Sequence, residues 1–240
     1  MTMDFRTLHH HATTEAPLVL PGPWDAASAR VFADTGFPAL ATPSAGVSAA
    51  LGHDDGGTPP QEMFDAVARI VRAVDVPVSA DIESGYRLAP PELVERLLET
   101  GAVGCNLEDS EAGQLLDPVY QADRLAAVRA AAGPELFLNA RVDTFVHGRG
   151  DIDDALARAR LYVEAGADGI YPIMAPPELL PRLAAAIDVP LNAAAFRPDG
   201  PSPAELGRLG ATRVTFGPRL LRETMAHTAR LARSLRSRPD

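Results

Sequence analysis

One structural unit recurs along the chain: a short apolar segment rich in β-branched residues, followed by an alanine-rich amphipathic stretch. The apolar segments predict strands at Leu18–Leu20, Ala39–Thr42, Val76–Ala80, Gly104–Leu107, Leu136–Ala140, Gly169–Ile173, Val189–Asn192 and Arg213–Phe216. The stretches between them predict helices at Asp25–Thr35, Pro60–Val74, Pro91–Thr100, Ala122–Ala132, Asp151–Ala165, Pro177–Ala186, Pro203–Leu209 and Pro218–Arg236. Eight such units in 240 residues predict an α/β fold of the closed (β/α)8, TIM-barrel type.

Proline and glycine mark the boundaries of these units, because proline opens several helical stretches and glycine follows several helix ends. A doubly wound open sheet is the alternative. Such a sheet would carry a glycine-rich nucleotide-binding turn after the first strand, and the segment Pro21–Asp25 is not one. Since no linker-like stretch divides the chain, we expect one barrel domain over residues 1–240, with an N-terminal extension at 1–16 and a C-terminal helical segment at 222–240.

The charged residues exclude several classes of function. All 22 basic residues are arginine, against 32 acidic residues, which gives a net charge of −10. An acidic chain without basic runs is a poor partner for nucleic acid or for an anionic membrane. The absence of lysine also excludes Schiff-base chemistry, so a metal, an arginine or backbone amides must polarise any substrate carbonyl.

The remaining composition indicates a cytoplasmic protein. No run of about 18 apolar residues is present, and Met1–Ala16 has no apolar stretch of the signal-peptide type. The single cysteine, Cys105, fits a reducing compartment, and we expect it to be a small core residue. The run His9–His11 is expected to lie in a solvated segment outside the barrel.

Acidic residues gather where the expected strands end, which is the functional face of a barrel. Asp81 and Glu83 share one side of the third strand because side chains alternate along a strand. By the same rule Asn106 and Glu108 share one side at the end of the fourth strand. So many carboxylates around one barrel mouth are costly without a cation, and oxygen-rich surroundings suit Mg²⁺ or Mn²⁺. We expect Asp81 to be the direct metal ligand, with Glu83, Glu108 and Asp55 holding metal-bound water.

Several acidic residues at or near the strand ends also have a purely structural interpretation. Asp25 has the position of a helix N-cap. Asp54 and Asp55 fit a solvated loop. Asp81 and Glu83 would also serve as ion-pair partners of Arg141 without any metal.

Four sequence segments at the strand ends occur in a fixed order along the chain. These segments are Pro21-Gly22-Pro23-Trp24-Asp25-Ala26-Ala27-Ser28-Ala29, Asp81-x-Glu83-x-Gly85-Tyr86, Asn106-Leu107-Glu108-Asp109 and Asn139-Ala140-Arg141-Val142-Asp143. Together they resemble the phosphoenolpyruvate mutase/isocitrate lyase superfamily, over about Leu18 to Leu221.

The resemblance implies a Mg²⁺-dependent barrel that binds an α-oxo acid or its enolate, and it assigns roles residue by residue. The implied metal residues are Asp81, Glu83 and Glu108, and the implied catalytic residues are Arg141, Glu108 and Asp55. Arg141 would pair with the anionic group of the substrate, and backbone amides near Ser44 and Ala45 would take its carboxylate. The expected substrate-contacting residues are Trp24, Ser44, Ala45, Gly46, Asp81, Arg141 and Asn192.

The segment after the fourth strand departs from the better-known members. Isocitrate and 2-methylisocitrate lyases carry Lys-Lys-Cys-Gly-His there, and phosphonate mutases carry lysines and an asparagine, whereas this chain has Ser110–Asp117 without Cys, Lys, His or Asn. The departure favours the less characterised branch that includes decarboxylases and retro-aldol lyases. We expect a loop at Ser110–Tyr120 to close over the site, with Tyr120, Glu111 or Asp117 as the proton donor.

The resulting hypothesis is a Mg²⁺-dependent lyase that cleaves a C–C bond of a 2-oxo or 2-hydroxy (di)carboxylic acid through a pyruvate-type enolate. Chemistry on a P–C bond, by a mutase or a phosphonopyruvate hydrolase, is the first alternative. A non-catalytic barrel that binds a small acid is the second. A sugar-phosphate isomerase with phosphate at Gly217–Arg219 is a remote third. The resemblance also implies a homo-oligomer, a dimer or a tetramer, in which the last helix is exchanged between subunits.

Overall fold

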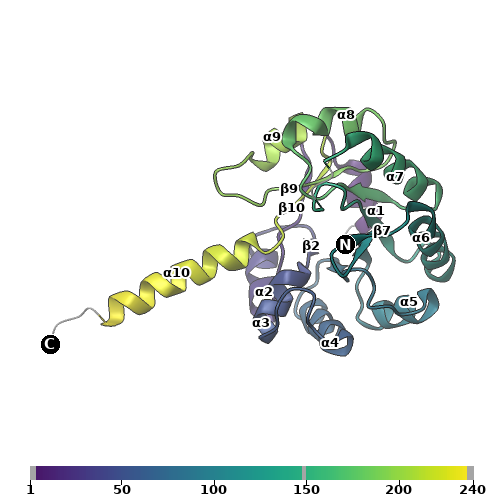
Figure 1. Cartoon of the computed structure of the whole chain (residues 1–240). Coiled ribbons are helices and arrows are strands. Elements are labelled where there is room, and N and C mark those ends of the chain that lie inside the picture. Colours follow the sequence, from purple (N-terminus) through teal and green to yellow (C-terminus); the bar gives the residue numbers. More distant parts are fainter. Residues whose placement is uncertain (1–3, 148–149, 237–240) are drawn as a thin grey trace.

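The computed structural model of the chain describes residues 4–147 and 150–236, which form a ring of parallel strands surrounded by helices (Figure 1). The barrel strands are β1 (Leu18–Val19), β2 (Leu40–Ala41), β3 (Val78–Asp81), β4 (Gly104–Leu107), β7 (Phe137–Arg141), β8 (Gly169–Tyr171), β9 (Asn192–Ala194) and β10 (Arg213–Thr215). The expected TIM-type barrel is therefore confirmed.

The strands are arranged in two parallel sheets that together close the ring. One sheet has the order β1-β10-β9 and the other β2-β3-β4-β7-β8. A bridge between Ile170 and Leu191 joins β8 to the start of β9, and the amide of Ala41 donates to the carbonyl of Pro21 at 3.1 Å on the other side. Within the larger sheet Asp81 is opposite Asn106, and Asn106 is opposite Asn139, so these side chains lie at one level of the barrel.

The helices begin at residues that suit a first turn. The helices outside the barrel are α2 (Ala26–Asp34), α3 (Ser44–Leu51), α4 (Pro60–Val71), α5 (Pro90–Glu99), α6 (Pro118–Ala132), α7 (Ile152–Glu164), a 3₁₀ turn at Pro177–Leu179 leading into α8 (Leu180–Ala184), and α9 (Pro203–Arg208). Proline is at or next to the first position of α4, α5, α6 and α9, while Asp25, Asp117, Asp151 and Ser202 cap α2, α6, α7 and α9. The N-cap role expected for Asp25 is confirmed.

Three differences from the expected elements bear on the site. The strand expected at Val189–Asn192 lies further along, at Asn192–Ala194, so Asn192 opens the strand instead of ending it. The segment after β2 continues into the unexpected helix α3. The loop expected after β4 is shorter than predicted, because α6 already begins at Pro118. The segment between β4 and α6 contains a small hairpin of β5 (Ser110–Glu111) and β6 (Gln114–Leu115).

The N-terminal segment was expected to be solvated, and this is wrong for part of it. Helix α1 (Phe5–His11) packs against the barrel, with Phe5, Leu8 and His9 buried. His9 stacks on Phe137 at 3.9 Å between ring centroids and hydrogen-bonds the carbonyl of Phe5. Phe5, Leu8 and His9 recur at helical spacing, so one face of this helix is covered by the barrel while His10 and His11 remain exposed.

Cys105 lies inside β4 and is buried, as expected for a core residue. Burial raises the pKa of its thiol to about 12, so the thiol stays protonated and unreactive.

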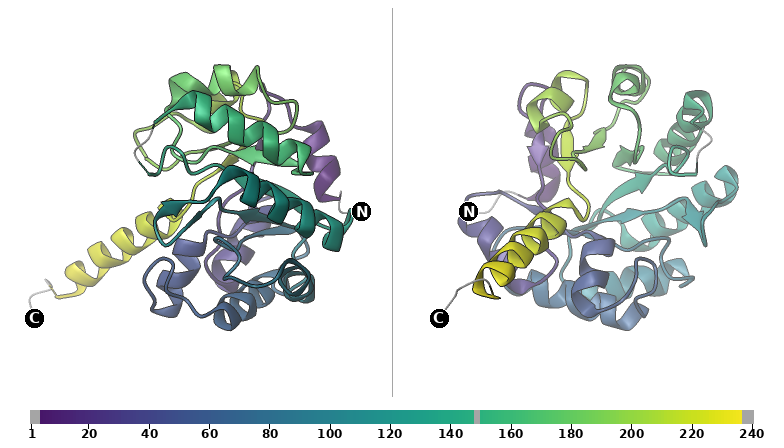
Figure 2. Two further views of the ribbon diagram at one scale, coloured as in Figure 1. Left: turned by 45° about the vertical axis from the view of Figure 1, so that its right-hand side comes forward. Right: turned by 60° about the vertical axis from the view of Figure 1, so that its left-hand side comes forward.

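Helix α10 (Arg219–Arg236) projects away from the barrel (Figures 1 and 2). Leu221 is its one buried residue, while Met225, Leu231 and Leu235 are exposed along its length. The helix thus leaves an apolar stripe that no described part of this chain covers.

Within the described ranges, no helix combines the length and the apolar character that crossing a membrane requires.

Candidate active site

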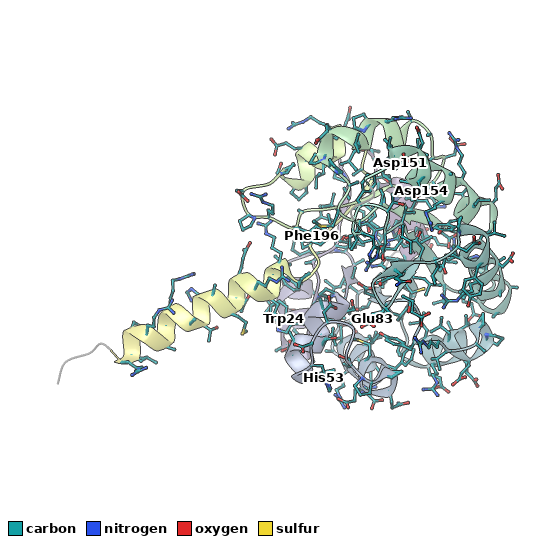
Figure 3. The ribbon with its side chains drawn as sticks, in the orientation of Figure 1. Trp24, His53, Glu83, Asp151, Asp154 and Phe196 are labelled. Atoms are coloured by element: carbon teal, nitrogen blue, oxygen red, sulfur yellow. The ribbon has the colours of Figure 1, made fainter. Side chains whose placement is uncertain are left out.

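A cavity of about 810 Å³ opens at the carboxyl ends of the strands, where a barrel carries its function. Side chains that the sequence analysis drew from separate segments meet on its wall. These are Ser44 and Ala45 at the start of α3, Asp55 between α3 and α4, Asp81 and Glu83 after β3, Glu108 after β4, and Arg141 and Asp143 after β7. In Figure 3 Glu83 lies below Phe196, toward the half of the barrel that carries His53.

Asp81 is the last residue of β3 and is held in place by its neighbours. The hydroxyl of Ser44 donates to its Oδ2 at 3.2 Å, and the amide of Glu83 donates to its Oδ1 at 3.3 Å. Burial raises the pKa of Asp81 above its ordinary value, against the attraction of Arg141. A half-buried carboxylate that is fixed in this way is suited to bind a cation.

Glu83 has a backbone conformation that is unusual for a residue with a side chain, with φ at +52°. Its Oε1 is buried and has no hydrogen-bond partner among the described residues. Burial, together with repulsion from Asp81 and Asp55, raises its pKa to about 7. A carboxylate oxygen left without a partner indicates that the site receives a donor or a cation from outside the chain.

Glu108 and Asp143 share the guanidinium of Arg141. Arg141 forms an ion pair with Glu108 through Nη1, and its Nε and Nη2 donate to the two oxygens of Asp143 at 2.9 and 3.0 Å. Burial above all raises the pKa of Glu108 to about 9. Burial lowers the pKa of Arg141, but Glu108, Asp143 and Asp81 outweigh it, so this pKa lies above its ordinary range and the arginine stays charged.

The donor set fits a hard divalent cation that keeps most of its water. All the candidate donors are oxygens, and three of the carboxyl groups are hard to ionise without added positive charge. In the part of the chain that is described, no three His, Cys, Asp or Glu side chains come close enough to ligate one ion directly. Asp81, Glu83 and Glu108, the three expected metal residues, therefore do not form a site in which all three ligate the ion directly. One direct ligand with the others acting through water remains compatible with Mg²⁺.

The hairpin β5–β6 stands at the edge of the cavity on a buried anchor. Asp109 is fully buried, where it accepts from the amide of Asp143 at 2.7 Å, from Tyr162 at 2.8 Å and from Arg158 at 3.1 Å. The turn residues Ala112 and Gly113 have positive φ, as a tight hairpin requires.

Of the expected proton donors, Glu111 alone lines the cavity. Asp117 caps α6, and Tyr120 is exposed on that helix.

Three residues expected to contact substrate do not line the cavity. The ring of Trp24 packs edge-on against Phe32. Gly46 lies inside α3, where a Cβ would come within 2.8 Å of Pro43. Asn192 is fully buried below the cavity, and it bonds Asn139 at 3.2 Å and Thr215 at 3.0 Å. Asn192 lies outside the cavity because β9 begins at this residue, so Asn192 opens the strand and does not stand at its carboxyl end.

Among the polar residues of the cavity wall that sequence reasoning missed, two have a buried polar atom without a partner among the described residues. The hydroxyl of Tyr86 and Nε2 of His147 are both buried without a partner in the described structure. Tyr86 belongs to the segment after the third strand, so the sequence could have indicated its position. No sequence pattern indicated His147, because only the path of the turn after β7 brings this residue to the cavity.

The fold and the site together define the class of protein: a TIM-type barrel with an oxygen-rich, carboxylate-lined site at the strand ends. The chain matches the family described as phosphoenolpyruvate phosphomutase over residues 5–236, and it belongs to the phosphoenolpyruvate mutase/isocitrate lyase superfamily. An uncharacterised protein of Mycobacterium tuberculosis is 37% identical over 217 residues, which cover 90% of this chain and 82% of the relative.

A crystal structure from Burkholderia cenocepacia, of a protein whose name suggests a phosphonomutase without establishing it, is 42% identical, with a TM-score of 0.88 over 95% of this chain and 97% of the other. A chloroplastic carboxyvinyl-carboxyphosphonate phosphorylmutase of Arabidopsis thaliana is 34% identical over 71% of this chain and 55% of its own length.

The superfamily contains both C–C lyases and enzymes of P–C chemistry. A 2-methylisocitrate lyase of Bacillus subtilis is 30% identical over 65% of this chain and 54% of its own length. A phosphonopyruvate hydrolase crystallised with oxalate and Mg²⁺ shares the fold, with a TM-score of 0.86 at 20% identity over 98% of this chain and 87% of the other.

Proposed function

We propose that this protein is a Mg²⁺-dependent lyase that cleaves a C–C bond of a 2-oxo or 2-hydroxy (di)carboxylic acid. The observation that carries the proposal is the charge of the cavity wall. Six described acidic side chains line it, and its two described arginines, Arg87 and Arg141, are both already paired with carboxylates. A phosphonate carries more negative charge than a carboxylate, so this wall accommodates a carboxylic acid more readily.

The residues at the cavity divide the work of holding the substrate. Arg141 presents its guanidinium, already oriented by Asp143, to a substrate carboxylate. The first turn of α3 brings a further donor. Its N-cap Pro43 offers no side-chain oxygen, the amide of Ser44 is turned to Asp81, and that of Gly46 donates to the carbonyl of Pro43 at 3.0 Å, which leaves the amide of Ala45 for a substrate carboxylate. Both groups bind and orient the acid before a bond breaks.

The metal would be held by Asp81 directly and by Glu83, Glu108 and Asp55 through water. When bound, the cation supplies a Lewis acid that stabilises the negative charge of an enolate, which is worth several kcal/mol of the barrier. Glu83 and Glu108 would hold the metal-bound water through their carboxyl groups. The pKa values of both groups are raised, so a nearby cation would favour their charged form. The hairpin at Ser110–Glu111 would exclude bulk water at the cavity edge.

The test is a substrate screen in the presence of Mg²⁺, using oxaloacetate, substituted malates and phosphonopyruvate. We expect pyruvate together with CO₂ or a second carbon product, and no inorganic phosphate. Release of phosphate from phosphonopyruvate, without turnover of any carboxylic acid, would support the P–C alternative. Tight oxalate binding without any turnover would support a binding barrel.

The Asp81→Ala variant tests the metal site. It should lose metal-dependent turnover and Mn²⁺ binding while keeping the fold, whereas Asp65→Ala, on the exposed side of α4, should retain both. Full activity in excess chelator would contradict the proposal.

We also propose that the protein is a homo-oligomer built through α10. Its exposed apolar residues Met225, Leu231 and Leu235 would pack on a second copy. Leu231→Glu with Leu235→Glu should lower the molar mass measured by light scattering to that of a 25.4 kDa monomer. An unchanged mass would contradict this assembly.

A further inference from the structure

The two sides of the active-site cavity differ in chemistry. Asp55 and the segments after β3 and β4 supply most of its carboxylates, and Arg141 and Asp143 stand together at the end of β7. The loops after β7, β8, β9 and β10 also supply an apolar part of the wall, made of Val146, Ile173, Met174, Phe196 and Pro218. We call these five residues the apolar wall.

The apolar wall presents large side chains to solvent at the cavity mouth. Val146 is 43% exposed and Met174 is 57% exposed. Met174 also adopts φ of +62°, a conformation that costs a residue with a side chain about 1 kcal/mol. An exposed apolar side chain in a strained conformation beside a site is a feature that a ligand would cover.

A second cavity of about 200 Å³ continues behind this wall and shares Met174 and Phe196 with the first. Its lining is mostly apolar and includes Pro172, Pro176, Leu180, Ala195 and Leu206. Phe196 is the ring between the two cavities, and it packs closely on Gly217, where a Cβ would come within 2.4 Å of the ring. Figure 3 places Phe196 on the opposite side of the site from His53 and above Glu83.

The described cations around both cavities already have partners. Arg87 is paired with Glu111, Arg141 with Glu108 and Asp143, and Arg197 with Asp199. Arg219 follows the apolar wall in sequence, but its guanidinium bonds Glu223 at 2.7 Å and the carbonyl of Ala195 at 3.1 Å. If a substrate placed a second anionic group on the apolar wall, that group would meet an apolar surface, and none of these four arginines would be free to pair with it.

We propose that the substrate carries an uncharged, apolar substituent of a few carbons beyond its acid head, and that this substituent lies on the apolar wall. The inference rests on the proposed function, because the carboxylates and Arg141 must first place the acid head. It narrows the substrate class to acids that carry an alkyl substituent in addition to the carboxyl groups that the cleavage uses, and it excludes a further charged group at the end of that substituent.

Binding of simple 2-oxo acids to the full chain in Mg²⁺ tests the inference without needing the true substrate. Pyruvate, 2-oxobutanoate and 2-oxopentanoate extend an apolar tail, while oxaloacetate, 2-oxoglutarate and phosphonopyruvate extend a charged one. Competition against oxalate, followed by calorimetry, gives each affinity. Each added methylene should tighten binding about fourfold relative to pyruvate, and a charged tail should bring no gain.

Variants of the apolar wall test whether its residues cause the preference for an apolar tail. The quantity measured in each variant is the ratio of its affinities for 2-oxopentanoate and pyruvate. Phe196→Ala should bring this ratio close to one. Met174→Lys should shift the preference at least tenfold toward oxaloacetate. Val31→Lys, a matched change of an exposed apolar residue on α2, should keep the wild-type ratio.

The remaining outcomes overturn the inference in distinguishable ways. An unchanged ratio in both wall variants, or equal affinity along the apolar series, would show that the tail does not lie on the wall. Tighter binding of charged tails, abolished in His147→Gln, would assign the tail to that imidazole instead. If the wild-type chain binds neither oxalate nor any 2-oxo acid with Mg²⁺, the proposed function fails, and the inference fails with it.

Discussion

Arg141 grips Asp143 with two parallel hydrogen bonds, from Nε to Oδ1 at 2.9 Å and from Nη2 to Oδ2 at 3.0 Å. The two residues are two positions apart, so alternation along the extended end of β7 turns both toward the cavity. This pairing fixes the plane of the guanidinium and leaves Nη1 to Glu108. The geometry explains why an arginine, and not a point charge, is needed at this position.

Arg141→Lys should lower both kcat/KM and oxalate affinity by about 100-fold, because a lysine cannot hold Asp143 and a substrate carboxylate at fixed angles. Steady-state kinetics on the substrate found by the screen, with oxalate calorimetry, measure the two effects. Arg160→Lys on α7 is the matched control. Values within threefold of wild type for Arg141→Lys would show that the planar fork is not used.

Glu83→Gln should weaken Mn²⁺ binding by about 10- to 100-fold, because a residue that holds a metal-bound water tunes the affinity without ligating the ion. Electron paramagnetic resonance titration of free Mn²⁺ gives the dissociation constant directly. Glu95→Gln, on the exposed side of α5, should bind as the wild type does. Equal affinity in both variants would remove Glu83 from the metal site.

Stability should depend on pH through His9. Burial lowers the pKa of His9 from 6.5 to about 3 in the folded chain, so the folded state keeps the neutral ring while the unfolded chain takes up a proton below pH 6.5. The contribution of His9 to the free energy of unfolding is therefore complete above pH 6.5. It decreases by up to about 1.4 kcal/mol per pH unit as the pH falls toward 3.

Urea unfolding of wild type and His9→Gln across this range isolates the effect, because the carboxyl groups are common to both chains. The difference between the two free energies of unfolding should shrink as the pH falls. His10→Gln, at an exposed position, should show no such trend. A difference that is independent of pH would contradict a buried neutral His9.

Arg158→Met should destabilise the fold by about 3–5 kcal/mol, because it leaves Asp109 charged, fully buried and without its cation. Arg87→Ala removes the exposed ion-pair partner of Glu111, a residue of the hairpin β5–β6, and should lower the free energy of unfolding by less than about 1 kcal/mol. Chemical denaturation of both variants compares them. Similar losses would mean that the anchor of the hairpin is not the buried pair.

Sequence periodicity predicted the barrel and most of its elements, because alternating apolar segments and helical stretches are local features of the chain. The same locality placed Asp81, Glu83, Glu108 and Arg141 at strand ends, and a parallel barrel must bring such ends to one face. Helix α1 was missed because its three buried residues lie in a segment rich in polar residues, including three histidines. Its burial depends on the barrel surface that receives it.

The chain by itself therefore determined which residues stand at the mouth of the barrel and that their charge is negative. The tertiary structure decided which of them share the cavity: it kept Asp55 and Arg141 there and left Trp24, Gly46 and Asn192 outside it. It also assembled an apolar wall from four separate loops, none of which has a recognisable pattern alone. The physical reason is that strand register and loop paths set distances between residues far apart in sequence, and local propensity does not encode those distances.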